Sequence, residues 1–288
     1  MSETNYLTTR EVARLCRVSD ATVKRWEDAG FLKSERTSGK HRRFRAEEVA
    51  RFQREQGLGQ KICHGDQSVV NSIAWRKTAS GANVTLFDLL VGGCEEETAN
   101  FLIGAYLQET ALTEIFDDLI SPAMQRIGDL WYRGELSVTQ EHIATRVAHY
   151  AVHKLRAALP LPEMLGKTAF CAVLEGDLHE LPAFLAQITI ENAGWDVMNF
   201  GANTPLFCLS DEILEHKPQA ICISATYLSD LERVGRDYKT FRETAVRLKI
   251  PVILGGKVFE DDIVRRRFPA ELYAESFTEV ADFFERNT

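Results

Sequence analysis

The sequence lacks three features that would place it in other classes of protein. It has no apolar run of membrane-spanning length, and its first residues do not form a signal peptide, so we expect a cytoplasmic protein without membrane contact. None of its six cysteines forms a Cys-x-x-Cys pair, which argues against a zinc site or a disulfide framework. Because Cys171 and Cys222 lie within apolar, strand-like runs, we expect them to be reduced core residues.

Positive charge is scarce over most of the chain and gathers near its N-terminus. Residues 1–56 hold 13 Lys and Arg against 9 Asp and Glu, a net charge of +4, whereas the whole chain of 288 residues carries −8. The remainder therefore carries −12. A basic segment joined to an acidic body predicts that only the basic segment meets a polyanion.

The basic segment has the pattern of two short helices joined by a tight turn. Thr8 or Thr9 can cap a first helix, and Ser19 or Asp20 can cap a second helix over 21–29. Such a pair predicts a helix-turn-helix, whose second helix enters the DNA major groove near its start. The side chains predicted to contact DNA there are Thr22, Lys24 and Arg25.

A cluster of cations surrounds Phe44 within Arg36–Arg45. Ser38-Gly39 is a turn signal, so the segment predicts a hairpin wing in which Phe44 anchors the strands and the cations meet phosphates. The cations assigned to DNA are Lys40, His41, Arg42 and Arg43. A charged run also fits a solvated loop, but its place beside the helix pair favours binding to double-stranded DNA.

Residues 82–160 show apolar positions at helical spacing throughout, which predicts a four-helix bundle. The expected helices span 84–90, 95–111, 112–132 and 137–159. Trp131 ends one helix, and Glu141 and His142 open the next, so a flat apolar plate and two hydrogen-bonding groups can converge on a ligand. A core tryptophan beside an exposed charged pair, in a bundle that serves as a spacer or dimerisation module, explains the same residues.

Strands and helices alternate over 167–288, which predicts a doubly wound, parallel, Rossmann-like sheet. Ligands bind such sheets at the carboxyl ends of the strands. Three loops fall there: Asp177-Leu-His179, Ser224-Ala-Thr226 and Gly255-Gly256. His179 can offer one ring nitrogen to a metal while Asp177 holds the other N–H. A loop histidine bonded to its own turn is the alternative on this stretch alone.

Two family resemblances connect these segments. Leu7 to Ala13, Val23 to Gly30 and Gly39 to Phe44 resemble the winged-helix DNA-binding domain of MerR-type regulators. The three loops of the tail resemble the cobalamin-binding domain in which Asp-x-His-x-x-Gly, Ser-x-(Leu/Thr) and Gly-Gly follow in order. The spacing from Trp131 to Glu141-His142 is similar to that of CarH/LitR-type light-sensing repressors.

The resemblance implies a cofactor, adenosylcobalamin, and a role for each candidate residue. His179 would be the lower cobalt ligand, and Asp177 would be its hydrogen-bond partner. The nucleotide tail of the cofactor would lie along Ser224, Thr226, Gly255 and Gly256. The adenosyl group would contact Trp131, Glu141 and His142.

At the level of the whole protein, the resemblance implies a regulator and not an enzyme. It implies a homodimer or homotetramer that assembles with the cofactor, binds operator DNA and represses genes for carotenoids or photoprotection. Light would disassemble it.

Two residues depart from the resemblance. Pro182 stands where the motif has its last Gly, and we expect a helix to begin there with the proline ring beside the nucleotide tail. Tyr132 follows Trp131 where the light sensors have a histidine, so we expect the lit state to lack a two-histidine trap for cobalt.

The sequence therefore predicts a multidomain chain with three parts. They are a winged helix-turn-helix head with its linker over 1–70, the bundle over 82–160 and the cobalamin-binding domain over 167–288. Gly57-Leu-Gly indicates a linker over 57–80 in place of a coiled coil. Two alternatives stay open: a MerR-type regulator that senses a bilin or heme or acts without cofactor, and a cobalamin carrier for methyl transfer.

Overall fold

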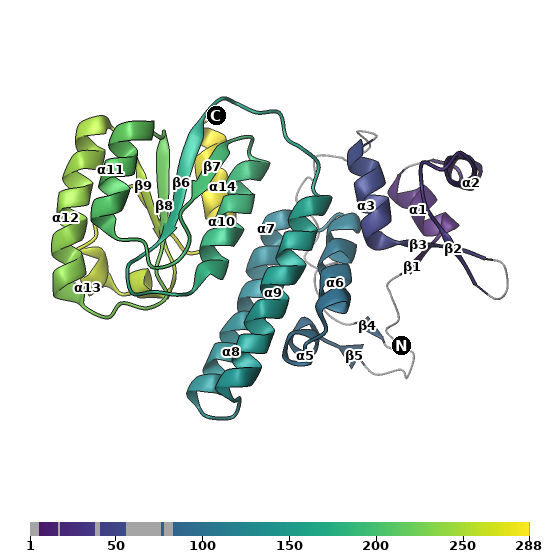
Figure 1. The fold of residues 1–288 in the computed structure, drawn as a ribbon, viewed down its shortest axis with the longest axis horizontal. Helices are drawn as coiled ribbons and strands as arrows, with labels where there is room; N and C mark the ends of the chain where they lie inside the picture. The colour runs from purple at the N-terminus through teal and green to yellow at the C-terminus, as the bar shows by residue number, and fades with distance from the viewer. Residues whose placement is uncertain (1–5, 17, 38–40, 56–75, 78–82, 288) are drawn as a thin grey trace. The chain divides into compact units, whose positions relative to one another are not determined.

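The computed structural model describes residues 6–16, 18–37, 41–55, 76–77 and 83–287 (Figure 1). The chain divides into two compact units, Met1–Leu161 and Pro162–Thr288. Most of the expected linker over 57–80 lies outside the described residues. Within the part that the structure describes, no helix combines the length and the apolar character needed to cross a membrane.

Residues 6–55 fold around one small core. Their elements are β1 (Tyr6–Thr8), α1 (Thr9–Leu15), α2 (Asp20–Asp28), β2 (Glu35–Arg36), β3 (Arg42–Arg45) and α3 (Ala46–Glu55). The three strands form an antiparallel sheet in the order β1-β3-β2. Phe44 on β3 is fully buried in the same cluster as Val12 of α1, Val23 of α2 and Phe52 of α3. The expectation that Phe44 anchors the wing is confirmed, and its burial contributes about 1.5–3 kcal/mol.

The remaining described residues of the N-terminal unit are helical, apart from one short pair of antiparallel strands. Their elements are β4 (Arg76–Lys77), β5 (Asn83–Val84), α5 (Leu86–Val91), α6 (Glu95–Leu107), α7 (Leu112–Glu114), the π-helical segment η1 (Ile115–Ile120), α8 (Ser121–Tyr132) and α9 (Val138–Ala158). Since α7, η1 and α8 follow one another without a break, these elements form four helical rods, as expected.

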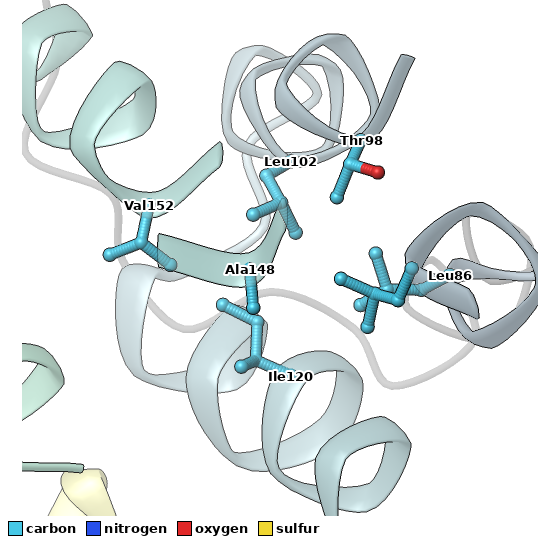
Figure 2. A pocket seen from close by; sticks show the side chains of 7 residues that line it. Leu86, Thr98, Leu102, Ile120, Ala148 and Val152 are labelled. Atoms are coloured by element: carbon cyan, nitrogen blue, oxygen red, sulfur yellow. The ribbon is translucent and has the colours of Figure 1, made fainter. Parts of the chain in front are cut away.

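The interior of these rods is packed with apolar side chains. Figure 2 shows the point where α5, α6, η1 and α9 meet. The gap there is lined by Leu86, Leu90, Thr98, Leu102, Ile120, Ala148 and Val152. It has no room for a water molecule. At this point the rods are closely packed, and the gap between them is not a ligand site.

The C-terminal unit is built on a parallel five-stranded sheet. From edge to edge the strands are β10 (Leu272–Ala274), β9 (Val252–Gly255), β8 (Ala220–Ser224), β6 (Thr168–Val173) and β7 (Asp196–Asn199). The connecting helices are α10 (Glu180–Asn192), α11 (Leu206–His216), α12 (Leu231–Leu248), the 3-10 helix η2 (Lys257–Glu260), α13 (Asp262–Arg265) and α14 (Phe277–Arg286). The predicted doubly wound parallel sheet is confirmed.

Alternate residues of the central strands pack against opposite layers of helices. Phe170 and Ile223 belong to the core that also holds residues of α11 and α12. Cys171 and Cys222 face the other core, beside α10 and α14. Because β7 lies on one side of β6 and β8 on the other, the strand order reverses at β6, where such sheets bind ligands.

The predicted start of the helix after β6 was wrong. The helix expected to begin at Pro182 begins at Glu180, with His179 at its N-cap. Pro182 is the third helical residue, where its missing N–H costs no hydrogen bond within the helix. A proline marks the first turn of a helix and not one position in it, so the sequence could not fix the start more closely.

Candidate functional site

The candidate site lies where the loop after β6 meets the loop after β8. Asp177 is buried, with 1% of its surface exposed, and its two oxygens face different loops. Oδ1 accepts the backbone N–H of His179 at 3.0 Å and lies 2.5 Å from His179 Nδ1. Oδ2 accepts the backbone N–H groups of Thr226 at 2.5 Å and Tyr227 at 3.1 Å. One carboxylate thereby ties the imidazole to the neighbouring loop.

Hydrogen bonds keep Asp177 ionised. Burial by itself would raise the pKa of its carboxyl group, but the bonds from His179, Thr226 and Tyr227 hold that pKa below its usual value. An ionised Asp177 favours the tautomer of His179 that carries its proton on Nδ1, so that the lone pair on Nε2 can bind a metal. The side chain of His179 is 58% exposed.

Ser224 is the last residue of β8, in register with Val173 of β6 and Gly255 of β9. It is only 7% exposed, and its Oγ has no hydrogen-bond partner among the described residues. An unsatisfied buried hydroxyl costs about 1–3 kcal/mol. The carboxyl end of β8 therefore fits a ligand that supplies the missing hydrogen-bond partner.

Gly256 has a structural reason to be glycine. Its φ is +97°, and a Cβ there would lie 2.5 Å from the carbonyl oxygen of Ala225. Gly255 has more room, since its Cβ would meet Ala274 O at 3.4 Å. The loop after β9 comes close to the loop after β8 at Gly256. This close approach explains why the residue is glycine, so Gly256 by itself does not indicate a ligand.

The residues predicted to face the adenosyl group lie at one end of the helical rods. Trp131 is in the last turn of α8 and is 45% exposed, so it is not a core tryptophan. Glu141 on α9 accepts the hydroxyl of Thr145 at 2.7 Å, and His142 Nε2 lies 3.6 Å from Glu141 Oε2. An aromatic face and a polar pair thus flank the short connection between α8 and α9.

The candidate DNA surface of the head surrounds a hollow of about 400 Å³. The hollow is lined by Thr8, Thr9, Arg10, Asp20, Lys24, His41, Arg42 and Arg43. It brings the starts of α1 and α2 together with β3, and four of its side chains are Lys or Arg. Arg25 is exposed on α2 and bonds to the hydroxyl of Thr22 at 3.3 Å, while Lys40 lies outside the described residues.

Arg42, a predicted DNA contact, already makes two ion pairs within the head. Its Nε donates to Glu27 at 2.7 Å and its terminal nitrogen to Asp28 at 3.0 Å. These bonds hold β3 against α2. A DNA contact by Arg42 stays a prediction, and it would compete with both ion pairs.

Sequence reasoning missed two contributors to the site in the C-terminal unit. Tyr227 acts through its backbone N–H, which any residue except proline provides. Asn203 accepts the N–H of Gly176 through its side chain at 2.8 Å. Its place just before Thr204-Pro205, after a strand, is the one signal that could have drawn attention to it.

Three family models match the chain. Residues 85–156 and residues 167–282 each match a B12 binding domain, and residues 6–57 match a helix-turn-helix domain. Together they support a cobalamin-binding protein with a helix-turn-helix domain.

Curated relatives are corrinoid proteins. Dimethylamine corrinoid protein 1 of Methanosarcina mazei is 23% identical over 192 residues, which are 65% of this chain and 87% of that protein. The trimethylamine corrinoid protein of Methanosarcina barkeri is 21% identical over 184 residues, 63% of this chain and 83% of that protein. The solved monomethylamine corrinoid protein of Methanosarcina barkeri is 19% identical, with a TM-score of 0.61 over 70% of this chain and 96% of that chain. That likeness shows a shared fold.

The residues at the carboxyl ends of β6 and β8 fit a cobalamin cofactor. Among the described residues, no group of three or more His, Cys, Asp or Glu comes together to hold a metal ion. A corrin ring supplies cobalt with ligands of its own, so one histidine from the protein is enough to bind that metal from below. The buried Oγ of Ser224 offers such a cofactor a hydrogen bond on the adjacent strand.

Proposed function

We propose that this chain is a cobalamin-dependent repressor of transcription that responds to light. The observation that carries the proposal is the Asp177 carboxylate, which orients His179 and fixes the loop after β8. The helix-turn-helix match over residues 6–57 supplies the link to DNA. His179 would bind cobalt through Nε2, and the hydroxyl of Ser224 would bind the nucleotide tail. Thr226, Gly255 and Gly256 would also contact that tail.

The form of the cofactor is part of the proposal. Adenosylcobalamin supplies a cobalt–carbon bond that visible light cleaves. The half-exposed ring of Trp131 would pack on the adenosyl group, and Glu141 and His142 would bind it. Tyr132 would leave the lit protein without a second histidine ligand.

We infer that the chain acts on DNA as a homodimer or homotetramer. Linked heads bind one operator far more tightly than a single head. Lys24, His41 and Arg43, which line the hollow of the head, would contact the duplex. Thr22, Arg25, Lys40 and Arg42 would add further contacts. Loss of the adenosyl group would loosen the assembly and relieve repression of carotenoid or photoprotection genes.

The test joins an absorption spectrum to DNA binding. Purified protein is mixed with adenosylcobalamin in the dark, desalted, and examined by spectroscopy and sizing chromatography before and after green light. We expect a retained corrin band, a larger assembly in the dark, and weaker binding to operator fragments after illumination. A desalted protein without a visible band would contradict the cobalamin site, and equal DNA binding in dark and light would contradict the light response.

A histidine variant separates the proposed ligand from the fold. His179→Ala removes the cobalt ligand, so its affinity for cobalamin should fall by at least about tenfold while the circular dichroism stays native. His216→Ala on α11, another exposed histidine of the same unit, is the matched control. Equal affinity in both variants would mean that another residue, or none, is the lower ligand.

A tryptophan variant tests the adenosyl contact. Trp131→Ala should weaken adenosylcobalamin binding more than methylcobalamin binding, because a methyl group is too small to reach a stacking partner. Equal losses for the two cobalamins would remove Trp131 from the adenosyl site.

The curated relatives favour a second function, a corrinoid carrier in methyl transfer. The helix-turn-helix match argues for the regulator, and we propose that the chain is not an enzyme. Methyl transfer from the methylcobalamin-loaded protein to a thiol acceptor, in the presence of a methyltransferase, would favour the carrier instead.

A further inference from the structure

Asn203 contacts the loop that carries His179 from the β7 side of the sheet. Its side-chain Oδ1 accepts the N–H of Gly176 at 2.8 Å. Its own backbone N–H donates to the carbonyl oxygen of Asp177 at 2.9 Å. Asn203 thereby holds both ends of the unit formed by Gly176 and Asp177.

The loop is held on its other side by β8. The backbone of Thr226 and Tyr227 binds the Asp177 side chain, whereas Asn203 binds the Asp177 main chain. With its side chain and its main chain both fixed, Asp177 has one orientation relative to the His179 ring. The side-chain bond of Asn203 fixes the peptide before Gly176, so its removal would free that peptide, one residue ahead of Asp177, to rotate.

The backbone of Asn203 suits this task. Its φ is +54°, in the left-handed region that asparagine tolerates better than most residues because its short amide bonds locally. Glycine accepts the same conformation without a side chain. Asn203→Gly therefore removes the bond to Gly176 and leaves the backbone path intact.

We propose that Asn203 is a positioning residue for the lower cobalt ligand: its paired hydrogen bonds to Gly176 and Asp177 hold His179 ready for cobalamin. The proposal rests on the proposed cobalamin function. Asn203 acts through Asp177. Loss of a group that bonds directly to a metal-ligating histidine, as Asp177 does, changes metal affinity by about 10–100-fold, so a residue that acts through Asp177 should have an effect at the lower end of that range.

The test uses the full-length protein and compares four forms. Asn203→Gly removes the side-chain bond, and Asn203→Asp keeps an acceptor oxygen at the same place. Lys217→Gly, at another left-handed non-glycine position at the end of α11, controls for the backbone freedom that glycine adds. Wild type completes the set.

Three readouts are measured. Nitrogen NMR of the His179 ring in the protein without cofactor, assigned with His179→Gln, reports its tautomer. Hydrogen exchange reports protection of the Gly176 N–H, and absorption titration with hydroxocobalamin reports affinity.

Asn203→Gly should lower the share of the Nδ1–H tautomer, speed exchange of the Gly176 N–H at least tenfold and weaken hydroxocobalamin binding about tenfold. Asn203→Asp should stay within about threefold of wild type in affinity, and Lys217→Gly should match wild type in all three.

An unchanged tautomer and affinity in Asn203→Gly would overturn the proposal. So would a loss in Asn203→Asp equal to that in Asn203→Gly, or an equal loss in Lys217→Gly. If wild type retains no cobalamin, the proposed function fails, and the tautomer and exchange data, which need no cofactor, still decide whether Asn203 positions His179.

Discussion

Two glycines of the C-terminal unit show how one residue type meets opposite constraints. Gly256 has a φ of +97°, and a Cβ there would lie 2.5 Å from Ala225 O, whereas a Cβ on Gly235 in α12 would find its nearest neighbour at 4.0 Å. Gly256→Ala should lower the free energy of unfolding by about 2–4 kcal/mol through strain and displacement of the Ala225 loop. Gly235→Ala should raise it by about 0.5–1 kcal/mol, because alanine favours the helix.

Urea unfolding followed by circular dichroism, with wild type as reference, measures both changes. Since the two substitutions add the same methyl group to the same unit, a similar effect at the two positions would contradict the close approach at Gly256.

At this scale the sequence predicts side-chain partners better than main-chain partners. The spacing Asp177-x-His179 predicts the observed contact, because two side chains so close in a tight loop can reach each other. Nothing in Thr226 or Tyr227 signals that their N–H groups complete the Asp177 carboxylate, since those groups are common to all residues but proline. Contacts made by the backbone can be identified only once the fold is known.

The wing formed by β2 and β3 is fixed to α2 by a carboxylate, which makes its attachment sensitive to pH. Burial would raise the pKa of Glu27, but its hydrogen bonds to Arg42 and Ser34 hold that pKa below its usual value. The folded pKa lies below the unfolded value of about 4.3, so the stabilisation is complete above that pH and is lost as pH falls through the folded pKa.

Glu27→Gln should therefore destabilise the head by about 1 kcal/mol at pH 7 and by much less near pH 3. Thermal unfolding of the full chain across this range, followed by the NMR signal of the Trp26 indole N–H, measures the difference. Glu232→Gln on α12, in the other unit, should leave the unfolding of the head unchanged. A difference in stability that stays constant from pH 7 to pH 3 would mean that Glu27 is not ionised in the folded head.

The spacing of apolar residues predicted which segments form helices and strands, but it predicted the ends of these elements less well. Apolar spacing predicts a helix over 95–111, but α6 ends at Leu107, and Glu109 takes a left-handed φ of +67°. A glutamate in the left-handed region is uncommon, so the residue types do not predict that the helix ends there. The π-helical segment η1 was missed for a related reason, because it uses the same residue types as an α-helix.

For the molecule as a whole, charge predicts which part meets DNA and how that binding responds to salt. The segment 1–56 carries +4 and the remainder −12, so contacts to phosphate should come from the head alone. Arg43→Ala removes one cation from the hollow beside α2. It should weaken binding to all DNA sequences alike and reduce the slope of log affinity against log salt by about one.

Fluorescence anisotropy with operator and unrelated duplexes at several salt concentrations checks this. Arg133→Ala, an exposed arginine after α8, changes the net charge equally and should leave the slope unaltered. A loss confined to one DNA sequence would reassign Arg43 from phosphate to a base.

The wide turn at η1 has a consequence for how this protein can change over generations. The N–H of Ser121 bonds back to the carbonyl of Phe116, five residues earlier, so the turn holds one residue more than an α-helix needs. The wide turn absorbs that residue, so its deletion would restore ordinary pitch and leave the residues after it facing nearly the same way. Trp131 would then keep its face of the rod. In a helix without such a turn, the same deletion would rotate everything after it by about 100°. In a lineage of such proteins, this one turn can therefore gain or lose a residue without moving the tryptophan.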